Sequence, residues 1–484
     1  MLSASRLAAY QALWAVETDR DDLPSALARA RGALRDERDR ALVTEIATGT
    51  LRWQGQLDAV IAHFCRRPVS RLDPEILIVL RLSAYQLLHL ARIPAAAATN
   101  EAVTLARQVR KASAAGFVNA ILRSIWRARS HLPLPGRPTG DMVNCVTTDR
   151  AAHEAALDYL SVTLSHPRWL AARWLARYGF DAAVQWERFN NAAAPLTLRV
   201  NTLKTTTADL AHGLRDHGVF TTPASYAPDG LVIVEGNPLR TPLTDLGVFF
   251  VQDEASQLVG LLTAARPGER VLDCCASPGG KTTLMVAAMR NDGLVVAADV
   301  RPRRVELLRS TVERSGARCV RTVQFDAQQP LPFHGTPFDL VLIDAPCSGL
   351  GTIRRDPEIR WRRQESDLTR FAASQLLMLE NAATIVRPGG RIVYATCSSE
   401  PDENEAVVAA FSLAHPSFAL VDMRSHAPRG LAAVLDDRGM LRTSPVAHGL
   451  EAFFGAVLQR RDDSAINPDQ HLSCGTIISN FAGT

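Results

Sequence analysis

The chain has 484 residues, of which 47% are hydrophobic and 21% are charged, a composition typical of a globular protein with about three domains. No run of about 18 apolar residues predicts a membrane span, and eight scattered cysteines without a CxxC pair argue against a disulfide framework or a metal site, so we expect a reducing, cytoplasmic location. The net charge of +4 combines 20 basic and 12 acidic residues over 1–140 with 34 and 38 over the remainder.

This basic N-terminal third suggests a nucleic-acid partner, although a solvated arginine-rich surface would give the same count. Residues 1–135 are predicted to form an all-α bundle, because apolar residues recur with helical spacing and strand-like alternation is absent. The expected helices span 5–18, 38–51, 56–64, 74–90, 96–110 and 116–128.

The segment 131–140 contains three prolines and two glycines, which predict a linker. Residues 150–250 mix helical and strand-like patterns, which predict a small α+β domain. The expected helices there are 154–164, 168–178, 181–190 and 207–217, and the expected strands are 196–200, 230–234 and 248–251.

Residues 251–461 alternate apolar strands with helices, a pattern that predicts a Rossmann-like, doubly wound and mostly parallel sheet. The expected strands are 270–275, 294–300, 319–325, 338–345 and 391–397. Residues 462–484 are predicted to be a polar, weakly ordered tail. The expected fold class is therefore multidomain, with an all-α bundle, a small α+β domain and an α/β domain.

The turn after the first strand of this sheet, VLDCCASPGGKTT (271–283), has features of a ligand-binding loop. Gly279 and Gly280 permit close backbone approach where a helix begins. A P-loop would need a glycine where Cys275 stands, so nucleotide hydrolysis is not expected. Lys281 is one of only three lysines in the chain, which suggests that a compact positive charge is needed in this turn.

Acidic residues mark the ends of the next three strands. Asp299 ends the second strand, at the position whose carboxylate usually accepts hydrogen bonds from ribose hydroxyls. Asp326 and Asp344 end the third and the fourth. Any one of them alone could cap a helix, but ligands of open α/β sheets bind at the carboxyl ends of the strands, so together they favour a binding site.

Two cysteines follow strands that we expect to be neighbours. Cys347 lies in DAPCSGLG (344–351) and Cys397 in ATCSSEPDENE (395–405), so the two should meet above the sheet. A thiolate that adds to C6 of cytosine makes C5 able to attack a methyl sulfonium. Asp344 could hydrogen-bond N3 and the amine of the base, and Lys281 or a helix N-terminus could hold a thiolate. A cysteine alone is more often a small buried hydrophobe. We expect this role for the thiols of Cys65, Cys274, Cys275 and Cys319.

These motifs resemble the RNA 5-methylcytosine methyltransferases of the NOL1/NOP2/Sun (Fmu) family. The matching pieces also include RVN (199–201), VQDEASQLV (251–259) and RRDPEIRW (354–361). The resemblance implies S-adenosyl-L-methionine as cofactor, Cys397 as nucleophile and Cys347 as the residue that assists product release. The cofactor-binding residues that it implies are Cys275, Ala276, Ser277, Pro278, Gly279, Gly280, Lys281, Asp299, Asp326 and Asp344, with Asp344 and Lys281 also catalytic.

The N-terminal helices resemble the NusB-like RNA-binding domain, through residues 38–52, 92–107 and 116–123. A NusB-like bundle joined to such a catalytic core is the arrangement of the bacterial RsmB-type enzymes, which methylate a cytosine in 16S ribosomal RNA. The resemblance covers roughly residues 1–460 and implies a role in rRNA processing, with small-subunit rRNA as the partner of a monomeric enzyme. The sequence departs from the family pattern at Ser277, where alanine is usual, and at Glu451–Ala452, where Asp-Gly is usual.

Three alternatives remain open at this point. The substrate could be tRNA, or the chain could be a noncatalytic NusB-like RNA-binding protein, which the cysteine pair disfavours. The attacking thiol could instead be Cys347, because DNA cytosine methyltransferases place their nucleophile in a Pro-Cys turn. A run of arginines after this turn is expected either to contact RNA phosphates or to form a solvated helix face. Its members are Arg354, Arg355, Arg360, Arg362 and Arg363.

Overall fold

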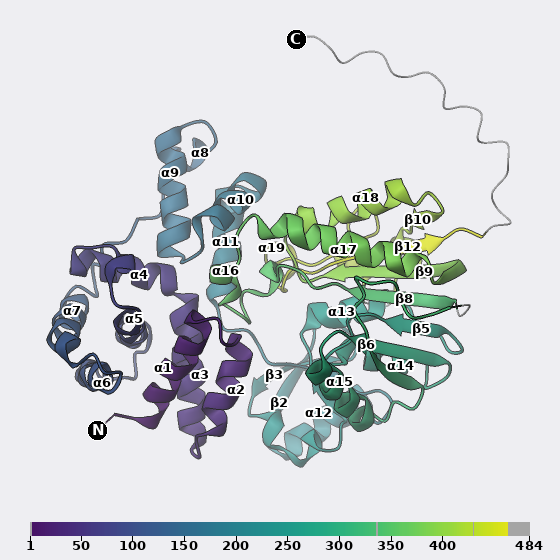
Figure 1. Ribbon diagram of the computed structural model, residues 1–484, viewed down its shortest axis with the longest axis horizontal. Coiled ribbons are helices and arrows are strands. Elements are labelled where there is room, and N and C mark those ends of the chain that lie inside the picture. The colour runs from purple at the N-terminus through teal and green to yellow at the C-terminus, as the bar shows by residue number, and fades with distance from the viewer. Residues whose placement is uncertain (1, 335–336, 429, 463–484) are drawn as a thin grey trace, which may run out of the picture.

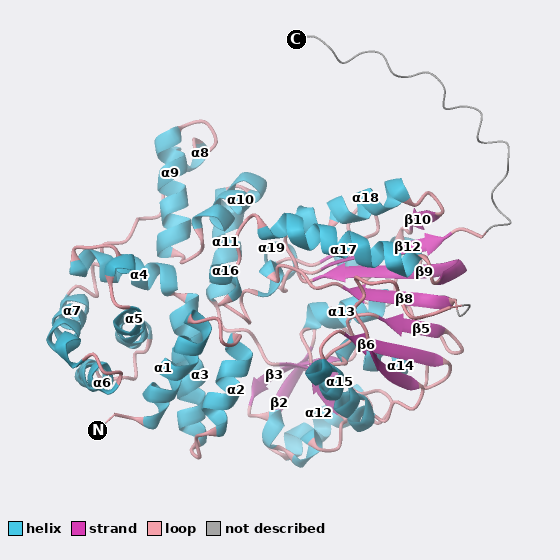
Figure 2. Ribbon diagram, in the orientation of Figure 1, coloured by secondary structure: helices cyan, strands magenta, loops and turns pink. Residues whose placement is uncertain are grey.

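The computed structural model describes residues 2–334, 337–428 and 430–462. It contains a helical N-terminal region, a small sheet with flanking helices and a large mixed sheet covered by helices on both faces (Figures 1 and 2). The multidomain fold class expected from the sequence is confirmed. The expected tail at 462–484 lies outside the described residues, apart from its first residue.

In the N-terminal region, helix α5 forms the centre because every residue from Ile76 to Leu87 is buried. The other helices present one apolar side to it, and all six predicted helices occur within three residues of their expected bounds. Sequence periodicity missed α2, since only Leu23 and Ala26 of its ten residues are buried. The helices are α1 (Ala4–Glu17), α2 (Leu23–Gly32), α3 (Glu37–Arg52), α4 (Gln54–Cys65), α5 (Pro74–His89), α6 (Ala95–Gln108) and α7 (Ala115–Arg127).

The middle region joins four helices to a small antiparallel sheet of order β2-β3-β1-β4. Its helices are α8 (Asp141–Asn144), α9 (Arg150–Asp158), α10 (Arg168–Tyr178) and α11 (Phe180–Asn191), and α12 (Thr207–Asp216) packs on the sheet. The strands are β1 (Thr197–Val200), β2 (Phe220–Pro223), β3 (Gly230–Glu235) and β4 (Phe249–Val251). Strand β2 was not predicted, because it is an edge strand with no buried residue and therefore lacks an apolar pattern.

The large sheet has the strand order β10-β12-β9-β8-β5-β6-β7, with β11 paired to β12. Its strands are β5 (Arg270–Asp273), β6 (Leu294–Asp299), β7 (Val320–Gln324), β8 (Phe338–Asp344), β9 (Val386–Thr396), β10 (Phe418–Leu420), β11 (Leu441–Arg442) and β12 (Phe454–Arg460). Its helices are α13 (Glu254–Leu262), α14 (Gly280–Ala288), α15 (Pro302–Ser315), α16 (Ile359–Arg362), α17 (Asp367–Ala383), α18 (Glu405–Ala414) and α19 (Pro445–His448).

The five predicted strands of this sheet are its parallel core, from β9 through β8, β5 and β6 to β7. Strands β10, β11 and β12, which pair antiparallel, were not expected from the sequence. Strands β8 and β9 are parallel neighbours, and Asp344 is in register with Ala395. The turns that follow these two strands therefore start side by side at one edge of the sheet.

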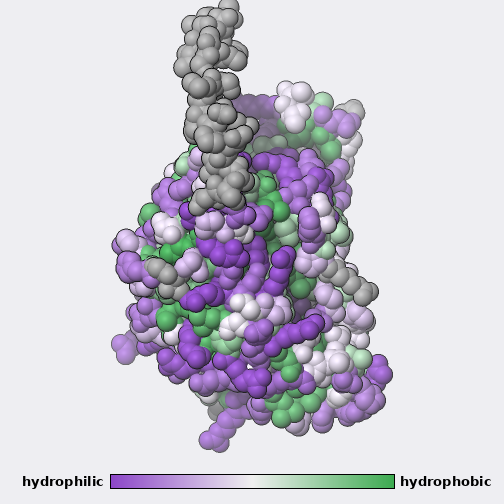
Figure 3. All heavy atoms as spheres, turned by 90° about the vertical axis from the view of Figure 1, so that its right-hand side faces the viewer, coloured by the Kyte–Doolittle hydropathy of each residue, from purple (hydrophilic) through white to green (hydrophobic). Residues whose placement is uncertain are grey.

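Figure 3 shows the face of the large sheet's domain at which the parallel strands begin, and this face is mainly hydrophilic. Among the described residues on that face, apolar groups are small and separated by hydrophilic ones. No helix in the described ranges is long and apolar enough to cross a membrane.

Within the arginine run after Cys347, Arg360 joins the domains, so neither an RNA contact nor a solvated helix face describes this residue. Arg360 is fully buried and donates hydrogen bonds to the Ser165 carbonyl and the Asn191 side chain, both at 2.9 Å. Arg362 pairs with Asp19 of the N-terminal region at 2.7 Å. The number of charged residues in a sequence does not predict this role. The partners of these arginines are oxygen atoms of segments that lie far away in the sequence.

Candidate active site

The two cysteines of the predicted pair lie in contact, with their Sγ atoms 3.2 Å apart. Each follows one of the parallel neighbours β8 and β9. Gly351 allows this approach, since a Cβ at that position would stand 1.9 Å from the Ala452 carbonyl oxygen and 2.8 Å from that of Cys397. The Gly351 amide donates to the Cys397 carbonyl at 2.9 Å, which ties the Cys347 turn directly to the Cys397 turn.

The Cys347 sulfur is held in its protonated form. A hydrogen bond with Cys397, together with burial, raises the pKa of Cys347 well above its usual range. Cys347 is therefore a neutral thiol whose S–H can donate to the Cys397 sulfur. This arrangement places a hydrogen-bond donor beside Cys397 and leaves Cys397 as the acceptor of the pair.

Lys281 and Asp344 form the charged part of the site. The Lys281 Nζ lies 2.6 Å from the Asp344 Oδ2 and 5.8 Å from the centre of the Phe453 ring. Burial disfavours the ammonium, but the Asp344 carboxylate and the nearby Cys397 sulfur raise the pKa of Lys281 on balance. The lysine therefore remains a cation, and its charge acts on both the carboxylate and the Cys397 sulfur.

The glycine-rich loop leads from β5 into α14, as expected. Gly279 has φ +106°, and a Cβ there would be strained and would meet Leu308 at 3.0 Å. A Cβ on Gly280 would meet Gln252 at 3.2 Å, so both positions favour glycine. Residues 275–281 form a cradle over the strand ends, and at Gly279 and Gly280 no side chain separates the backbone of this cradle from a bound molecule. Such a cradle fits a cofactor.

Asp273, which the sequence analysis did not select, lies at the tip of β5 beneath this loop. Its Oδ2 accepts a hydrogen bond from the Thr282 hydroxyl at 2.7 Å, whereas its buried Oδ1 has no hydrogen-bond partner among the described residues. Burial raises the pKa of Asp273 to about 7. A buried acceptor without a partner beside the cradle is a further point at which a polar ligand fits.

The other two predicted carboxylates occupy the expected edge of the sheet. Asp299 ends β6, is nearly buried, and accepts from the Arg301 amide at 3.2 Å. Asp326 accepts from the Gln328 amide at 3.0 Å. One detail of the expectation is wrong: β7 ends at Gln324, so Asp326 lies two residues beyond the strand.

Burial disfavours the thiolate form of four other cysteines. Cys274 is buried, and burial raises the pKa of its thiol and of the Cys275 thiol. Burial also raises the thiol pKa of Cys65 and of Cys319, which are distant from the site in the fold. These environments agree with the packing role expected for all four thiols.

The Cys397 turn is anchored to the middle region by Glu400, a residue that the sequence analysis quoted but gave no role. The fully buried carboxylate accepts from Arg173 Nε at 2.7 Å, Trp174 Nε1 at 3.1 Å and Arg177 NH2 at 3.3 Å. All three donors belong to α10. The catalytic turn therefore depends on a helix outside the large sheet.

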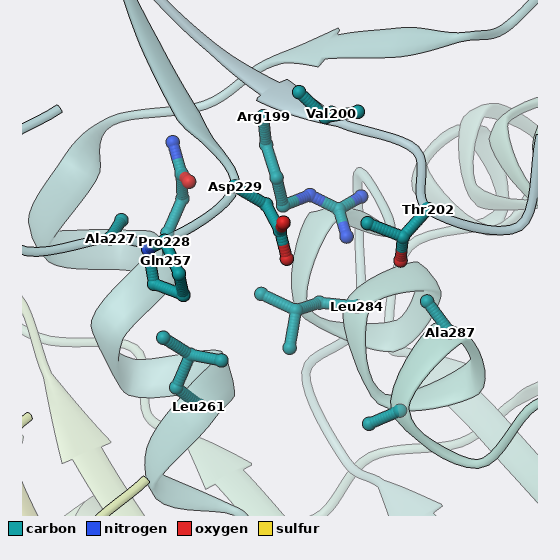
Figure 4. Close-up of a pocket in the computed structure, with 11 residues that line it drawn as sticks. Arg199, Val200, Thr202, Ala227, Pro228, Asp229, Gln257, Leu261, Leu284 and Ala287 are labelled. Atoms are coloured by element: carbon teal, nitrogen blue, oxygen red, sulfur yellow. The ribbon is translucent and has the colours of Figure 1, made fainter. Parts of the chain in front are cut away.

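A second missed contact supports the glycine-rich loop. Arg199, in the RVN segment of β1, donates to the hydroxyl of Thr283 in the first turn of α14 at 2.6 Å. It lines a cavity of about 110 Å³ between the small sheet and helices α13 and α14. Figure 4 shows its guanidinium beside Asp229, with Leu284 on the facing wall. The small domain thus holds the cofactor loop from behind.

The unusual Glu451 is part of an ion-pair group at the rim of the site. Its Oε1 lies 3.0 Å from Arg355 Nε, and Arg355 also pairs with Asp253 at 2.7 Å. The loop that contains Glu451 and Ala452 is therefore ordered although these residues differ from the family pattern. In this loop the Ala452 amide donates to the Gly351 carbonyl at 3.0 Å. No group of three His, Cys, Asp or Glu residues within the described ranges could hold a metal ion.

Family models of known proteins match three stretches of the chain, one in each part of the fold. The model described as 16S rRNA methyltransferase RsmB/F matches residues 261–459, and that of the NusB family matches residues 3–127. The ferredoxin-like domain of RsmF/B-like methyltransferases matches residues 166–240.

Individual proteins match over most of their length. The probable ribosomal RNA small subunit methyltransferase B of Bacillus subtilis is 33% identical over 427 residues, which cover 88% of this chain and 91% of that protein. The ribosomal RNA small subunit methyltransferase B of Pseudomonas putida is 34% identical over 427 residues, with coverages of 87% and 92%. The crystal structure of PH0851 matches with a TM-score of 0.77 and 27% identity, over 95% of this chain and 99% of that one.

Proposed function

The chain belongs to the RsmB/F family of 16S rRNA methyltransferases, and from that membership we propose that it methylates C5 of a cytosine in 16S rRNA through a covalent bond from Cys397 to C6 of the base. The observation that carries this proposal is the 3.2 Å contact between the Cys397 and Cys347 sulfurs beside the Lys281–Asp344 ion pair. A thiol packed only for stability would not need a second thiol and a paired lysine next to it.

The proposed cofactor is S-adenosyl-L-methionine, which supplies a methyl group on a positively charged sulfur when bound. The residues that would hold it are the cradle 275–281, Asp299 and Asp326, with Asp273 beneath the cradle. The carboxylate of Asp299 suits ribose hydroxyls because, among the described residues, it accepts one amide hydrogen bond, from Arg301, and its Oδ2 lies 3.8 Å from the Arg304 guanidinium, which leaves room for further donors.

In the proposed reaction, the Cys397 thiolate bonds to C6, and the electron pair of the C5–C6 double bond moves to C5. The cofactor would supply the methyl group that bonds to C5, and the electron pair of the broken methyl–sulfur bond would stay on the cofactor's sulfur as a neutral thioether. The Asp344 carboxylate accepts a hydrogen bond from the exocyclic amine of the base, and in its protonated form it donates that proton to N3 as C6 is attacked, while Lys281 stabilises both the carboxylate and the thiolate. Afterwards the C5 proton passes to water, the C6–S bond breaks, and its electron pair returns to the Cys397 sulfur. Cys347 stabilises this leaving thiolate by donating its S–H.

The proposed partner is small-subunit rRNA, which the protein meets in the cytoplasm as a monomer. The basic N-terminal region, whose family model is that of NusB, would supply phosphate contacts. A tRNA substrate would use the same chemistry, and the relatives' names favour rRNA. A purely RNA-binding role leaves the sulfur pair without a purpose.

Bisulfite sequencing of total RNA tests this function, because bisulfite converts cytosine but spares 5-methylcytosine. Cells that express the protein should show one protected cytosine in 16S rRNA, which is converted when the gene is deleted and protected again when wild-type protein is restored. Protection confined to tRNA would move the substrate to tRNA. No difference in any RNA would contradict the proposal.

A further inference from the structure

A buried carboxylate, that of Glu403, joins the turns that carry the two cysteines. Its Oε2 accepts hydrogen bonds from the hydroxyls of Ser348 at 2.5 Å and Ser398 at 2.6 Å. Its Oε1 accepts from the Ser348 amide at 2.8 Å. These serines directly follow the two cysteines in the sequence, so one side chain fixes both turns from below.

The remaining contact of Glu403 comes from Gln375 on α17, whose Nε2 donates to Oε1 at 3.1 Å. Gln375 is itself held by the Pro346 carbonyl, to which its Nε2 donates at 3.0 Å, and its Oε1 lies 3.0 Å from the Tyr394 hydroxyl oxygen. All four contacts of the Glu403 carboxylate are therefore N–H or O–H donors, and the residue is fully buried. This is the environment of an ionised carboxylate, because a protonated one would need an acceptor in place of a donor.

The charges around the two sulfurs are arranged unequally. The hydrogen bond with Cys397 and burial are the main causes of the raised pKa of Cys347, and the Glu403 carboxylate adds to them by disfavouring a second negative charge there. On the other side, the Lys281 ammonium interacts with the Cys397 sulfur. An anion beside one thiol and a cation beside the other favour a proton on the first and a negative charge on the second.

We propose that Glu403 is a positioning residue that holds the two sulfurs in contact and, through its charge, keeps the proton on Cys347 so that Cys397 is the sulfur that attacks. The assignment of the attacking sulfur rests on the proposed function, whereas the proton distribution does not. Glu403 touches neither sulfur through its own hydrogen bonds. It acts through Ser348 and Ser398.

Other charged and titratable groups near the two sulfurs also affect how Cys347 and Cys397 titrate. Arg363 donates to the Ser348 carbonyl at 2.9 Å, and Asp344 balances Lys281 on the Cys397 side. The Tyr394 hydroxyl donates to the Glu403 carbonyl at 2.5 Å, and burial raises the pKa of this tyrosine well above its usual range. These groups are unchanged in the variants below, so a change in cysteine titration reports on the Glu403 charge.

The test is the pH dependence of iodoacetamide alkylation, with each cysteine followed separately by peptide mass spectrometry, in the absence of RNA. In the full-length wild-type protein, Cys397 should react at lower pH than Cys347. In Glu403→Gln, which keeps the size and loses the charge, the midpoint for Cys347 should fall by about one pH unit, the effect of one close charge. Glu403→Asp keeps the charge and should keep the wild-type midpoint.

The control is Glu365→Gln, an exposed residue paired with Arg173, which should leave both midpoints unchanged. A Cys347 midpoint that is the same in Glu403→Gln as in wild type would overturn the proposal. If that variant does not fold, the wild-type order still decides, because a Cys347 that titrates below Cys397 would contradict it. If the wild-type enzyme forms no covalent adduct with RNA, the proposed function is contradicted, but the conclusion from the alkylation midpoints about Glu403 is unaffected.

Discussion

Lys281 and Asp344 form an ion pair of 2.6 Å between the glycine-rich loop and the end of β8, directly beside the sulfur pair. The lysine is one of three in a chain that otherwise uses arginine as its cation. A single ammonium thus pairs with the Asp344 carboxylate and interacts with the Cys397 sulfur.

Removing the charge of this carboxylate should stop the chemistry without unfolding the protein. Asp344→Asn is expected to lower the rate of methyl transfer by about 100-fold or more, the size of a lost acid–base contact. The measurement is incorporation of a radioactive methyl group into 16S rRNA. Asp339→Asn is the control, because Asp339 is the second residue of the same strand, at the end opposite Asp344, and pairs with Arg387. Equal rates for both variants would show that Asp344 does not touch the base.

Substitution of each cysteine should separate attack from release. Cys397→Ala should abolish both methylation and any covalent protein–RNA complex, because no sulfur remains to bond to C6. Cys347→Ala should trap a complex that migrates slowly on a denaturing gel, because the leaving thiolate loses its hydrogen-bond donor. The opposite pattern would exchange the two roles and favour Cys347 as the attacking thiol. Cys65→Ala, far from the site, should behave as wild type.

Much of this site could be predicted from the sequence, because its parts are local to strand ends. The helix expected at 168–178 is α10 to the residue, and the adjacency of β8 and β9 follows from the order of a doubly wound sheet. The supports could not be predicted in the same way. Periodicity shows which face of an element is buried, but it does not show which distant residue contacts that face. The contacts of Glu403 and Arg360 are therefore visible only in the structure.

Cofactor affinity should depend on Asp299. Asp299→Ala is expected to weaken the binding of S-adenosylmethionine by about 10-fold or more, since hydrogen bonds to a charged acceptor contribute roughly 1.5–3 kcal/mol. Isothermal titration calorimetry measures this without RNA. Glu306→Ala serves as the control, because that side chain is largely exposed on α15. Unchanged affinity in Asp299→Ala would remove this residue from the cofactor site.

The buried Asp273 should make stability depend on pH. Burial raises its pKa to about 7 in the folded protein, whereas an unfolded aspartate ionises near pH 4. Between about pH 4 and 7 the folded state holds a proton that the unfolded chain has lost, so the free energy of unfolding falls as the pH rises through this window. The side chain of Asp273→Asn cannot ionise. As the pH rises through this window, the melting temperature of the variant should therefore increase relative to that of wild type. Parallel curves of melting temperature against pH would contradict the assignment.

The junction between the domains should depend on Arg360 far more than on its neighbour Arg362. Arg360→Met leaves buried acceptors of α11 and of the loop before α10 without their donor, and loss of a hydrogen bond to a charged group costs about 1.5–3 kcal/mol of the free energy of unfolding. Arg362 pairs with the exposed Asp19, so Arg362→Met should cost about 1 kcal/mol or less. Urea unfolding measures both. If these arginines instead contacted RNA phosphates, both variants would keep wild-type stability and lose RNA affinity together, with a shallower dependence of binding on salt.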